Sequence, residues 1–430
     1  MRSRLLIRLS APRLPQVVRG GVLLLCLATT LAFGLSGCKT ETAGATSAAA
    51  ALAPTPQVRV MLDNKTRRAF LIAERPPVLE AGGGRPLQLN LPAEPVSLSL
   101  TPAGWQLGDQ SFARGELTFT PEVDGSLAVN NKTYRGKLLF RPAGDTEFDV
   151  INIVDLESYL AGVLPQELLP NWHGETYKAQ AVVARTYAIW EVKTAGPGRG
   201  YFDLYDDDRS QVYGGMDSET DKSRAATAAT RGEVVVHETS EGWRIFKAYF
   251  HSTSGGVTLG NDVAFNEPPI KALSAQSLGN LGQASSRFTW DSVVMSKDEM
   301  TRRVKLWGQR RGHPVKAVGK IRRLEIADTN EFGRPTRFEI HDSGGNRYSM
   351  LPEEIRWSLN TDRPEGDPTI YSGFFVPINN QHNIVLAEGR GWGHGVGMCQ
   401  WSAEGLANKG QKHTAIVVGS YPGSRVVRAY

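Results

Sequence analysis

The sequence predicts a loop-rich α+β protein in which a β-rich domain precedes a mixed α/β core. Short apolar runs of strand length are separated by glycine- and asparagine-rich turns, and two alanine-rich stretches have helical spacing. The chain also holds 45 glycines and 24 prolines among 430 residues, which argues against a helical bundle. At this length, with 40% hydrophobic residues, it can form two or three domains with their own cores.

Residues 1–37 have the pattern of a secretory signal, basic as far as Arg19 and then apolar over 22–35. An apolar run of about 14 residues is short for a membrane-spanning helix. It ends in Leu35-Ser-Gly-Cys38, which looks like a bacterial lipoprotein box. In such proteins the cysteine matching Cys38 is acylated and becomes the new N-terminus. We therefore expect an exported lipoprotein anchored to a membrane at the cell envelope; an ordinary signal peptide or an uncleaved anchor is the alternative.

The charge of the whole chain is misleading, because all the charged side chains of residues 1–37 are five arginines. Removing that segment takes the formal charge from +5 to about zero (5 − 5). The charge therefore gives no support to nucleic-acid binding. Of the three cysteines, Cys26 would leave with the signal and Cys38 would carry lipid, so Cys399 has no intramolecular disulfide partner.

Residues 38–57 are rich in alanine, threonine and proline and are predicted to form a flexible tether. A β-rich N-terminal domain is predicted over 58–150, and no catalytic constellation is evident in it. Its expected strands are 58–62, 87–91, 96–100, 116–120 and 137–141.

The core begins at residue 151, and the segment 163–190 is its most informative part. A short helix is expected over 155–162. Pro165 and Pro170 make a helix through them unlikely, so Glu167 is expected in a loop among leucines. A carboxyl in apolar surroundings is a candidate for a raised pKa, as a general acid requires. A helix follows from Glu175, and Arg185 on it could point back at the same cleft. The alternative is a solvated acid and an ordinary ion-pair arginine.

The rest of the core, to residue 280, is expected to be mixed. The acidic loop at 201–215 does not match a calcium loop and is interpreted as solvated. An alanine-rich helix over 218–230, capped by Asp217 or Ser218, is predicted to end at Gly232. A hairpin around Glu241-Gly242 then leads to the segment 251–256, whose hydroxyls and imidazole are suited to hydrogen-bonding a sugar. A glycine turn satisfied by its own side chains is equally compatible.

An inserted β-rich subdomain is expected over 281–380, with a helix at 300–310 and strands at 321–327 and 337–341. The core resumes over 381–430.

Glycine occupies every second position from 389 to 397. This spacing is not that of a dinucleotide or phosphate loop, and it leaves room for a second backbone or a sugar. His394 projects from the ribbon as a candidate substrate contact, or is merely packed in the turn. A Cys/His pairing of Cys399 with His394 lacks a recognisable orienting partner. A helix over 402–408, closed by Gly410, is expected to follow.

Several blocks of the sequence, in order, resemble the stage II sporulation protein D / amidase-enhancer (SpoIID/LytB) family of bacterial cell-wall proteins. They are residues 157–167, 178–187, 211–215, 225–232, 249–256 and 391–398.

The resemblance implies a SpoIID-type core in which Glu167 is catalytic and Arg185 supports it. The expected substrate contacts are Tyr187, Gln211, His251, Ser252, Ser254 and His394. Some relatives hold zinc with two cysteines whose places are taken here by Tyr205 and Ser210, so no metal site and no cofactor are expected.

The resemblance implies a lytic transglycosylase of peptidoglycan glycan strands stripped of peptides. Glu167 would protonate the glycosidic oxygen and then accept the proton of the muramate 6-hydroxyl, giving a 1,6-anhydro product. One carboxyl suffices, because no water is activated. The alternative is a non-catalytic, glycan-binding enhancer of an N-acetylmuramoyl-L-alanine amidase. The expected partners are accordingly glycan strands, an amidase and, through the lipid, a membrane.

Overall fold

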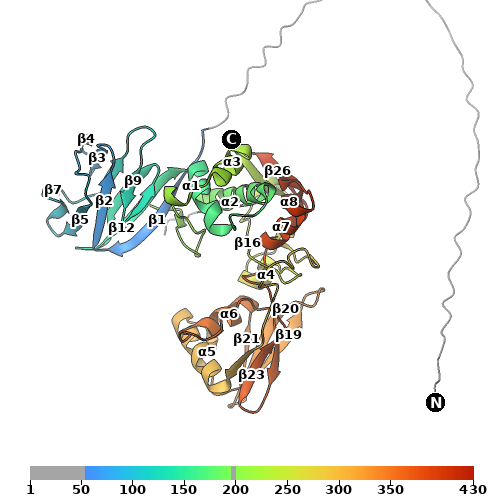
Figure 1. The fold of residues 1–430 in the computed structure, drawn as a ribbon. Helices are drawn as coiled ribbons and strands as arrows, with labels where there is room; N and C mark the ends of the chain where they lie inside the picture. Colours follow the sequence, from blue (N-terminus) through green and yellow to red (C-terminus); the bar gives the residue numbers. More distant parts are fainter. Residues whose placement is uncertain (1–53, 195–199) are drawn as a thin grey trace, which may run out of the picture. The chain divides into compact units, whose positions relative to one another are not determined.

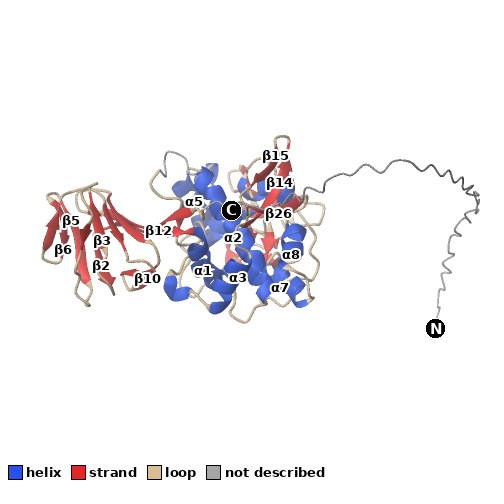
Figure 2. Cartoon of the chain, turned by 90° about the horizontal axis from the view of Figure 1, so that it is seen from above, coloured by secondary structure: helices blue, strands red, loops and turns tan. Residues whose placement is uncertain are grey.

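The computed structural model describes residues 54–194 and 200–430. The predicted signal, the predicted lipidation site Cys38 and most of the predicted tether lie outside these residues. Within the described part, no helix combines the length and apolar character needed to cross a membrane. Helices and several separate sheets together confirm the α+β class (Figure 2).

The N-terminal domain consists of two mainly antiparallel sheets. One has the order β13-β1-β12-β11-β8-β3-β4 and the other β10-β9-β2-β5-β6-β7 (Figure 1). Their strands are β1 Gln57–Thr66, β2 Arg68–Ala73, β3 Val78–Ala81, β4 Leu87–Gln88, β5 Val96–Thr101, β6 Gly104–Leu107, β7 Gln110–Phe112, β8 Leu117–Thr120, β9 Leu127–Val129, β10 Lys132–Tyr134, β11 Lys137–Pro142, β12 Phe148–Asp155 and β13 Leu204–Tyr205.

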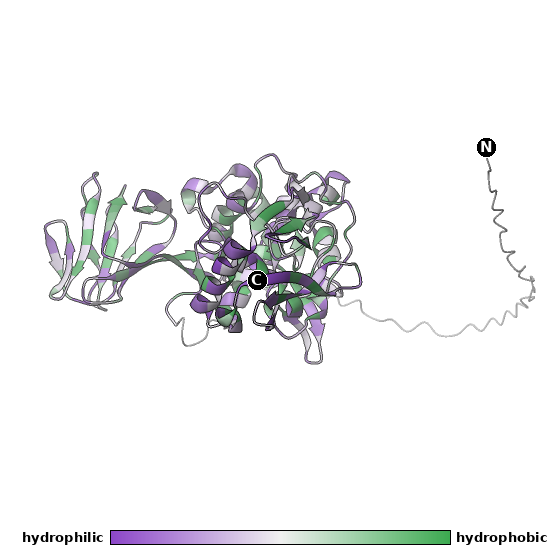
Figure 3. Ribbon diagram, turned by 90° about the horizontal axis from the view of Figure 1, so that it is seen from below, coloured by the Kyte–Doolittle hydropathy of each residue, from purple (hydrophilic) through white to green (hydrophobic). Residues whose placement is uncertain are grey.

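The two sheets share one apolar core, because each turns alternate residues inward. In β5 the buried residues are Val96, Leu98 and Leu100, with serines between them. Trp105 of one sheet meets Phe148 of the other edge to face at 5.1 Å between ring centroids. Figure 3 shows hydrophobic residues gathered on the strands of this domain. Four of the five expected strands are present here; the fifth, 87–91, shrinks to the two-residue β4.

Strand β12 runs directly into helix α1, Leu156–Glu167, which carries the candidate acid at its end. The side chain of Asp155 caps the helix by accepting hydrogen bonds from the N–H groups of Glu157 and Ser158. The expectation that no helix passes Pro165 is wrong, since Pro165 lies inside α1. The proline removes only one late hydrogen bond of the helix. Apolar packing compensates, because Leu164 and Leu168 are buried in a cluster with Trp172, Tyr177, Ala181 and Ala226.

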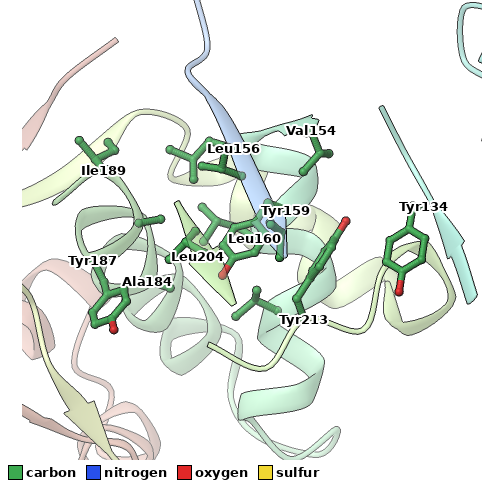
Figure 4. Packing of buried hydrophobic residues seen from close by; sticks show 14 of the residues in the cluster. Tyr134, Val154, Leu156, Tyr159, Leu160, Ala184, Tyr187, Ile189, Leu204 and Tyr213 are labelled. Carbon is green, nitrogen blue, oxygen red and sulfur yellow. The ribbon is translucent and has the colours of Figure 1, made fainter. Parts of the chain in front are cut away.

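Helix α2, Gly174–Thr194, lies at the centre of the core and is buried on nearly all sides. Figure 4 shows Leu160 of α1 and Leu204 of β13 between the two helices, with Tyr213 beside Tyr159. The next helix, α3 Asp221–Ala229, begins three residues later than expected, because Thr220 forms a capping box with Ser223. Gly232, at φ +73°, follows it as predicted.

The acidic loop before α3 is not fully solvated, which corrects the sequence interpretation. Asp203 is buried and pairs with Arg59 of β1, with 2.6 Å between Nη2 and Oδ1. Burial also raises the pKa of Asp206 to about 6.

The predicted hairpin is formed by β14 Glu233–Thr239 and β15 Gly242–Ile245, and β26 Ser424–Arg428 completes this sheet. The short strand β16 Phe250–His251 pairs in parallel with β25 Met398–Cys399. Helices α7 Gln400–Asn408 and α8 His413–Ser420 follow, and α7 begins two residues earlier than expected. A one-turn helix, α4 Asn261–Phe265, lies between β16 and the inserted segment.

Residues 290–386 contribute a second, separate hydrophobic core. Helices α5 Lys297–Arg311 and α6 Pro352–Asn360 lie beside the sheet of β19 Ile321–Thr329, β20 Pro335–Asp342 and β21 Arg347–Met350 (Figure 1). Strands β18 Val293–Ser296, β23 Asn383–Ala387 and β22 Val376–Asn379 form another sheet. A third pair, β17 Thr289–Trp290 with β24 Gly389–Arg390, connects this segment to the glycine ribbon.

Candidate active site

Glu167 is the last residue of α1, and its carboxylate accepts hydrogen bonds only from neutral groups among the described residues. The backbone N–H of Val212 donates to Oε1 at 3.1 Å, and the side-chain amide of Gln400 approaches Oε2 at 3.5 Å. No lysine, arginine or histidine of the described chain forms an ion pair with it.

Burial raises the pKa of Glu167 above its ordinary value, and the two neutral donors only partly oppose this effect. The carboxyl group is therefore biased toward its protonated form. A group with this bias at the wall of a cavity can donate a proton near neutral pH and accept it back.

Two adjoining cavities meet at Glu167, and both are lined by Glu167 and Trp392. The first has a volume of about 480 Å³ and the second about 420 Å³. We call them together the Glu167 groove. The other lining residues of the first cavity include Tyr187, Lys247, Tyr249, Arg356, Trp357 and His394. Those of the second include Trp172, Ser252, Ser285, Arg287, Gln400 and Trp401.

The alternating glycines let the ribbon lie directly against the strand that follows the hairpin. Thr253 and Trp392 exchange backbone hydrogen bonds of 3.0 and 2.7 Å. A Cβ added at Gly397 would lie 2.0 Å from the carbonyl oxygen of Tyr249. Gly395 likewise leaves space for the buried guanidinium of Arg334. The space predicted for a backbone or a sugar is thus occupied by the chain itself, and the glycines position Trp392 and His394 in the groove.

His394 is oriented by two backbone groups. Its Nε2 donates to the carbonyl of Phe250 at 2.8 Å, and its Nδ1 accepts from the N–H of Val396 at 3.0 Å. Burial lowers the pKa of His394 to about 4, so the ring is neutral at neutral pH. His394 can therefore offer a neutral ring surface to a ligand, and no charge.

His251 lies behind His394, with 5.5 Å between the ring centroids. Its Nδ1 bonds the carbonyl of Val396 at 3.1 Å, while its buried Nε2 has no hydrogen-bond partner. Burial lowers the pKa of His251 well below its ordinary value. His251 does not line the groove, so the expectation that it contacts substrate is wrong. Its ring instead packs behind His394 and bonds the glycine ribbon at Val396.

The expectation that Arg185 points at the same cleft as Glu167 is wrong. Arg185 is fully buried and forms a two-point ion pair with Glu157, at 3.0 and 2.6 Å. Glu157 also accepts a 2.6 Å hydrogen bond from the hydroxyl of Tyr430. Arg185 faces the first turn of α1, whereas Glu167 lies at the other end of that helix. It therefore holds α1, α2 and the C-terminus together.

The remaining predicted contacts divide into two groups. Tyr187 and Ser252 line the groove. Gln211 and Ser254 are buried and do not: Gln211 accepts from the hydroxyl of Tyr159 at 3.2 Å, and the Ser254 hydroxyl accepts from the N–H of Gly256. Gln211 therefore acts on the acid indirectly. It fixes the segment in which the next residue, Val212, donates its N–H to Glu167.

Most of the groove wall that faces α1 and α2 was not predicted from the sequence. Trp357 and Arg356 come from α6, and Ser285 and Arg287 from a turn before β17. The indoles of Trp357 and Trp392 are 46% and 48% exposed, which is unusual for so large an apolar group. The sequence shows that the two residues are tryptophans, but it shows neither that they are exposed nor that they share a surface.

Cys399 is buried and is the one free cysteine of the described residues. Its sulfur accepts a hydrogen bond from the hydroxyl of Ser402 at 3.1 Å. Both nitrogens of His394 are already occupied by backbone groups, so the Cys/His pairing is absent from the described structure.

Tyr205 and Ser210, which stand where the resemblance implies cysteines in some relatives, lie close together: the Tyr205 N–H donates to the Ser210 hydroxyl at 3.1 Å. Among described residues, one group has the composition of a metal site: Glu325, Glu339 and His341. It lies on β19 and β20 and does not line the groove. Arg323 and Arg347 each pair with one of its carboxylates, which weakens any attraction for a cation.

Comparisons with known proteins agree with this architecture. Residues 144–237 match the family model described as stage II sporulation protein (SpoIID), and residues 266–397 match a domain of unknown function, DUF8618. The chain is 27% identical to an uncharacterized protein of Brachyspira hyodysenteriae, over 71% of this chain and 75% of that protein. It is 26% identical to stage II sporulation protein D of Bacillus subtilis, over 67% of this chain and 79% of that protein.

A further relative is the amidase enhancer of Bacillus subtilis, 25% identical over 62% of this chain but only 40% of that longer protein. Helices α1 and α2, and with them Glu167, lie inside the SpoIID match. The chain is thus a SpoIID-domain protein with a β-rich domain before that domain. It is similar to proteins of the stage II sporulation protein D / amidase-enhancer (SpoIID/LytB) family, and its residues 144–237 match the SpoIID domain.

Proposed function

We propose that this protein remodels the bacterial cell wall as a lytic transglycosylase, cleaving peptidoglycan glycan strands with Glu167 as the single acid and base. The observation that carries the proposal is the environment of Glu167: a carboxyl with a raised pKa, no cationic partner among the described residues, and a place at the junction of two cavities. The family relatives give the cell wall as the setting.

The chemistry requires one proton donor that becomes a base. Protonated Glu167 donates to the glycosidic oxygen as the bond from that oxygen to C1 of N-acetylmuramate breaks. The resulting carboxylate takes the proton of the 6-hydroxyl of the same sugar, and O6 bonds to C1 to close the 1,6-anhydro ring. The protein regains its proton, and no water is consumed.

The other carboxylates that line the groove are less suited to this role. Glu353 is buried and paired with Arg356 through two hydrogen bonds of 3.0 Å, and Asp208 is exposed to solvent. Glu167 is the lining carboxyl whose surroundings favour a bound proton.

The groove also has the chemistry that a glycan strand requires. Exposed indoles of Trp357 and Trp392 can stack against the apolar faces of sugar rings, while serine hydroxyls and amides between them can bond hydroxyl and acetamido groups. Two cavities on either side of one acid suit a polymer that passes through the site.

The test uses the full-length protein in detergent, incubated with glycan strands freed of stem peptides. Mass spectrometry should detect 1,6-anhydro ends with the wild-type protein and none with Glu167→Gln. A Glu167→Gln protein that still produced anhydro ends would refute the assignment. Unchanged thermal melting of the variant at acidic pH shows that its fold is intact.

A second candidate is favoured by the relative named amidase enhancer, which matches 62% of this chain. In this reading the protein binds glycan strands or an N-acetylmuramoyl-L-alanine amidase and does no chemistry itself. Stimulation of such an amidase by wild type and Glu167→Gln equally, without anhydro ends, supports this candidate over the first.

We also propose that the protein acts outside the cytoplasmic membrane, anchored through a lipid on Cys38; the lipoprotein-box pattern Leu35-Ser-Gly-Cys38 supports this. Substitution of Cys38 by serine should abolish incorporation of labelled fatty acid and move the protein from the membrane to the soluble fraction. Continued labelling of the variant would contradict this localisation.

A further inference from the structure

The described residues that line the groove include four lysine and arginine side chains, and three of these are already paired. Arg209 bonds Asp207 at 2.7 Å, Lys247 bonds Glu191 at 2.9 Å, and Arg356 bonds Glu353. Arg287 is the exception: no carboxylate of the described residues lies within ion-pair distance of it. It lines the same cavity as Glu167 and Gln400.

Arg287 is nevertheless held in place. Its guanidinium carbon lies 4.3 Å from the centre of the Tyr371 ring, and that ring packs edge to face against Trp392 at 5.6 Å. Its backbone N–H donates to the hydroxyl of Ser285. Stacking on a ring fixes the plane of a guanidinium and leaves the N–H donors at its edge available.

An oriented guanidinium without an acid is suited to a two-point contact with a carboxylate ligand. Glycan strands carry such a group at one place, the lactyl ether on C3 of N-acetylmuramate. It belongs to the same ring as the C1 atom that reacts at Glu167, so it must lie in the same part of the groove. When a stem peptide is attached, this carboxylate is replaced by a neutral amide.

We propose that Arg287 binds the free lactyl carboxylate of N-acetylmuramate and makes the groove selective for glycan strands without stem peptides. The inference rests on the proposed function, because it takes a glycan as the ligand. It assigns substrate selection to the segment that matches the domain of unknown function, residues 266–397, while the acid lies in the SpoIID match.

Binding is measured in the Glu167→Gln background of the full-length protein, so that no strand is cleaved. The probes are peptide-free glycan strands with free carboxylates and the same strands after their carboxylates are coupled to methylamine. The parent should bind the free form about 10- to 100-fold more tightly, the range expected for a charge-assisted hydrogen-bonded pair.

Adding Arg287→Gln should abolish this preference and leave the affinity for the amidated strands unchanged. Arg287→Lys should keep part of it, since the charge remains but the two-point geometry is lost. Arg337→Gln is the matched control, because Arg337 is an exposed arginine of β20 that does not line the groove. It should behave as the parent does.

The proposal is overturned if the parent shows no preference, if it binds neither probe, or if Arg287→Gln keeps the preference. Failure of the proposed function is a separate result, namely no anhydro ends from the wild-type protein. The binding preference can be measured in that case too, so the two failures are distinguishable.

Discussion

The two ends of helix α1 carry two glutamates in contrasting environments. Glu157, in the first turn, bonds the guanidinium of Arg185, the hydroxyl of Tyr430 and the N–H of Gly232. Glu167, the last residue, bonds one backbone N–H and one side-chain amide. Glu157 is buried and Glu167 is half-buried at the wall of the groove, and among the described residues only Glu157 has a cation beside it.

This difference separates a structural acid, Glu157, from the proposed catalytic acid, Glu167. The carboxylate of Glu157 is paired with a guanidinium and ties elements together, whereas burial of Glu167 without a cation favours its proton. The helix fixes both at once, so the contacts at its first turn also determine where its last residue lies. The largest effects should therefore follow from breaking the pair at the structural end.

Arg185→Met should destabilise the protein by about 3–5 kcal/mol, because it leaves a buried carboxylate without its cation. Chemical denaturation monitored by circular dichroism measures the loss. Arg141→Met is the control, because Arg141 is part-exposed and its ion pair with Glu116 is a surface one. Wild-type stability of Arg185→Met would show that the Glu157 pair does not hold the helices together.

At the reactive end, Glu167→Gln should lower the rate of anhydro-product formation by about 10²- to 10⁴-fold, the usual contribution of a general acid–base group. The matched variant on the same helix is Glu157→Gln, which should reduce stability while the remaining folded protein stays active. Initial rates normalised to the folded fraction give the comparison. Equal rate losses in both variants would remove the distinction between the two glutamates.

The sequence predicted Glu167 because its signal is local: one acid among leucines in a segment that resembles a known family. It did not predict that α1 continues through Pro165, because the backbone rule for proline was outweighed by the burial of Leu164 and Leu168. It placed Arg185 in the wrong contact for a related reason. Which end of α1 faces that arginine depends on how two helices cross, and no local pattern records the crossing.

The opposing wall was even less accessible from the sequence. Arg287 and Trp357 are more than 100 residues beyond Glu167, in a turn and on a short helix of the inserted segment. Each reads as an ordinary surface residue in isolation. The alternating glycines were recognised as space for a neighbour, but identifying that neighbour as the segment 249–253 required the fold.

The contrast between Glu157 and Glu167, at the two ends of α1, also predicts how the stability of the protein depends on pH. The pKa of Glu167 is raised on folding above its ordinary value of 4.5, so the folded state binds this proton more tightly than the unfolded state. The contribution of this proton to the free energy of unfolding is fully present below pH 4.5, and it is lost as the pH rises through the pKa of Glu167 in the folded state.

Above its folded pKa, Glu167 is ionised in partly buried surroundings, which costs stability, and Glu167→Gln removes that cost. The variant should melt at a higher temperature than the wild type above the folded pKa of Glu167, and at a similar temperature at pH 4. The activity of the wild type should fall over the same alkaline limb, because the acid form is lost. Thermal melts and initial rates across pH 4 to 9 test both, and a Gln variant that is less stable at every pH contradicts the assigned shift.

The smallest expected effect concerns a residue that touches neither glutamate. Trp357→Ala should raise KM for glycan strands by about 2- to 13-fold with little change in kcat, because one aromatic contact contributes about 0.5–1.5 kcal/mol. Phe332→Ala is the matched control, as Phe332 is 41% exposed on the same inserted segment and does not line the groove. A change in kcat alone would mean that Trp357 acts on the geometry of Glu167. The inserted segment would then contribute to positioning the acid as well as to binding the glycan.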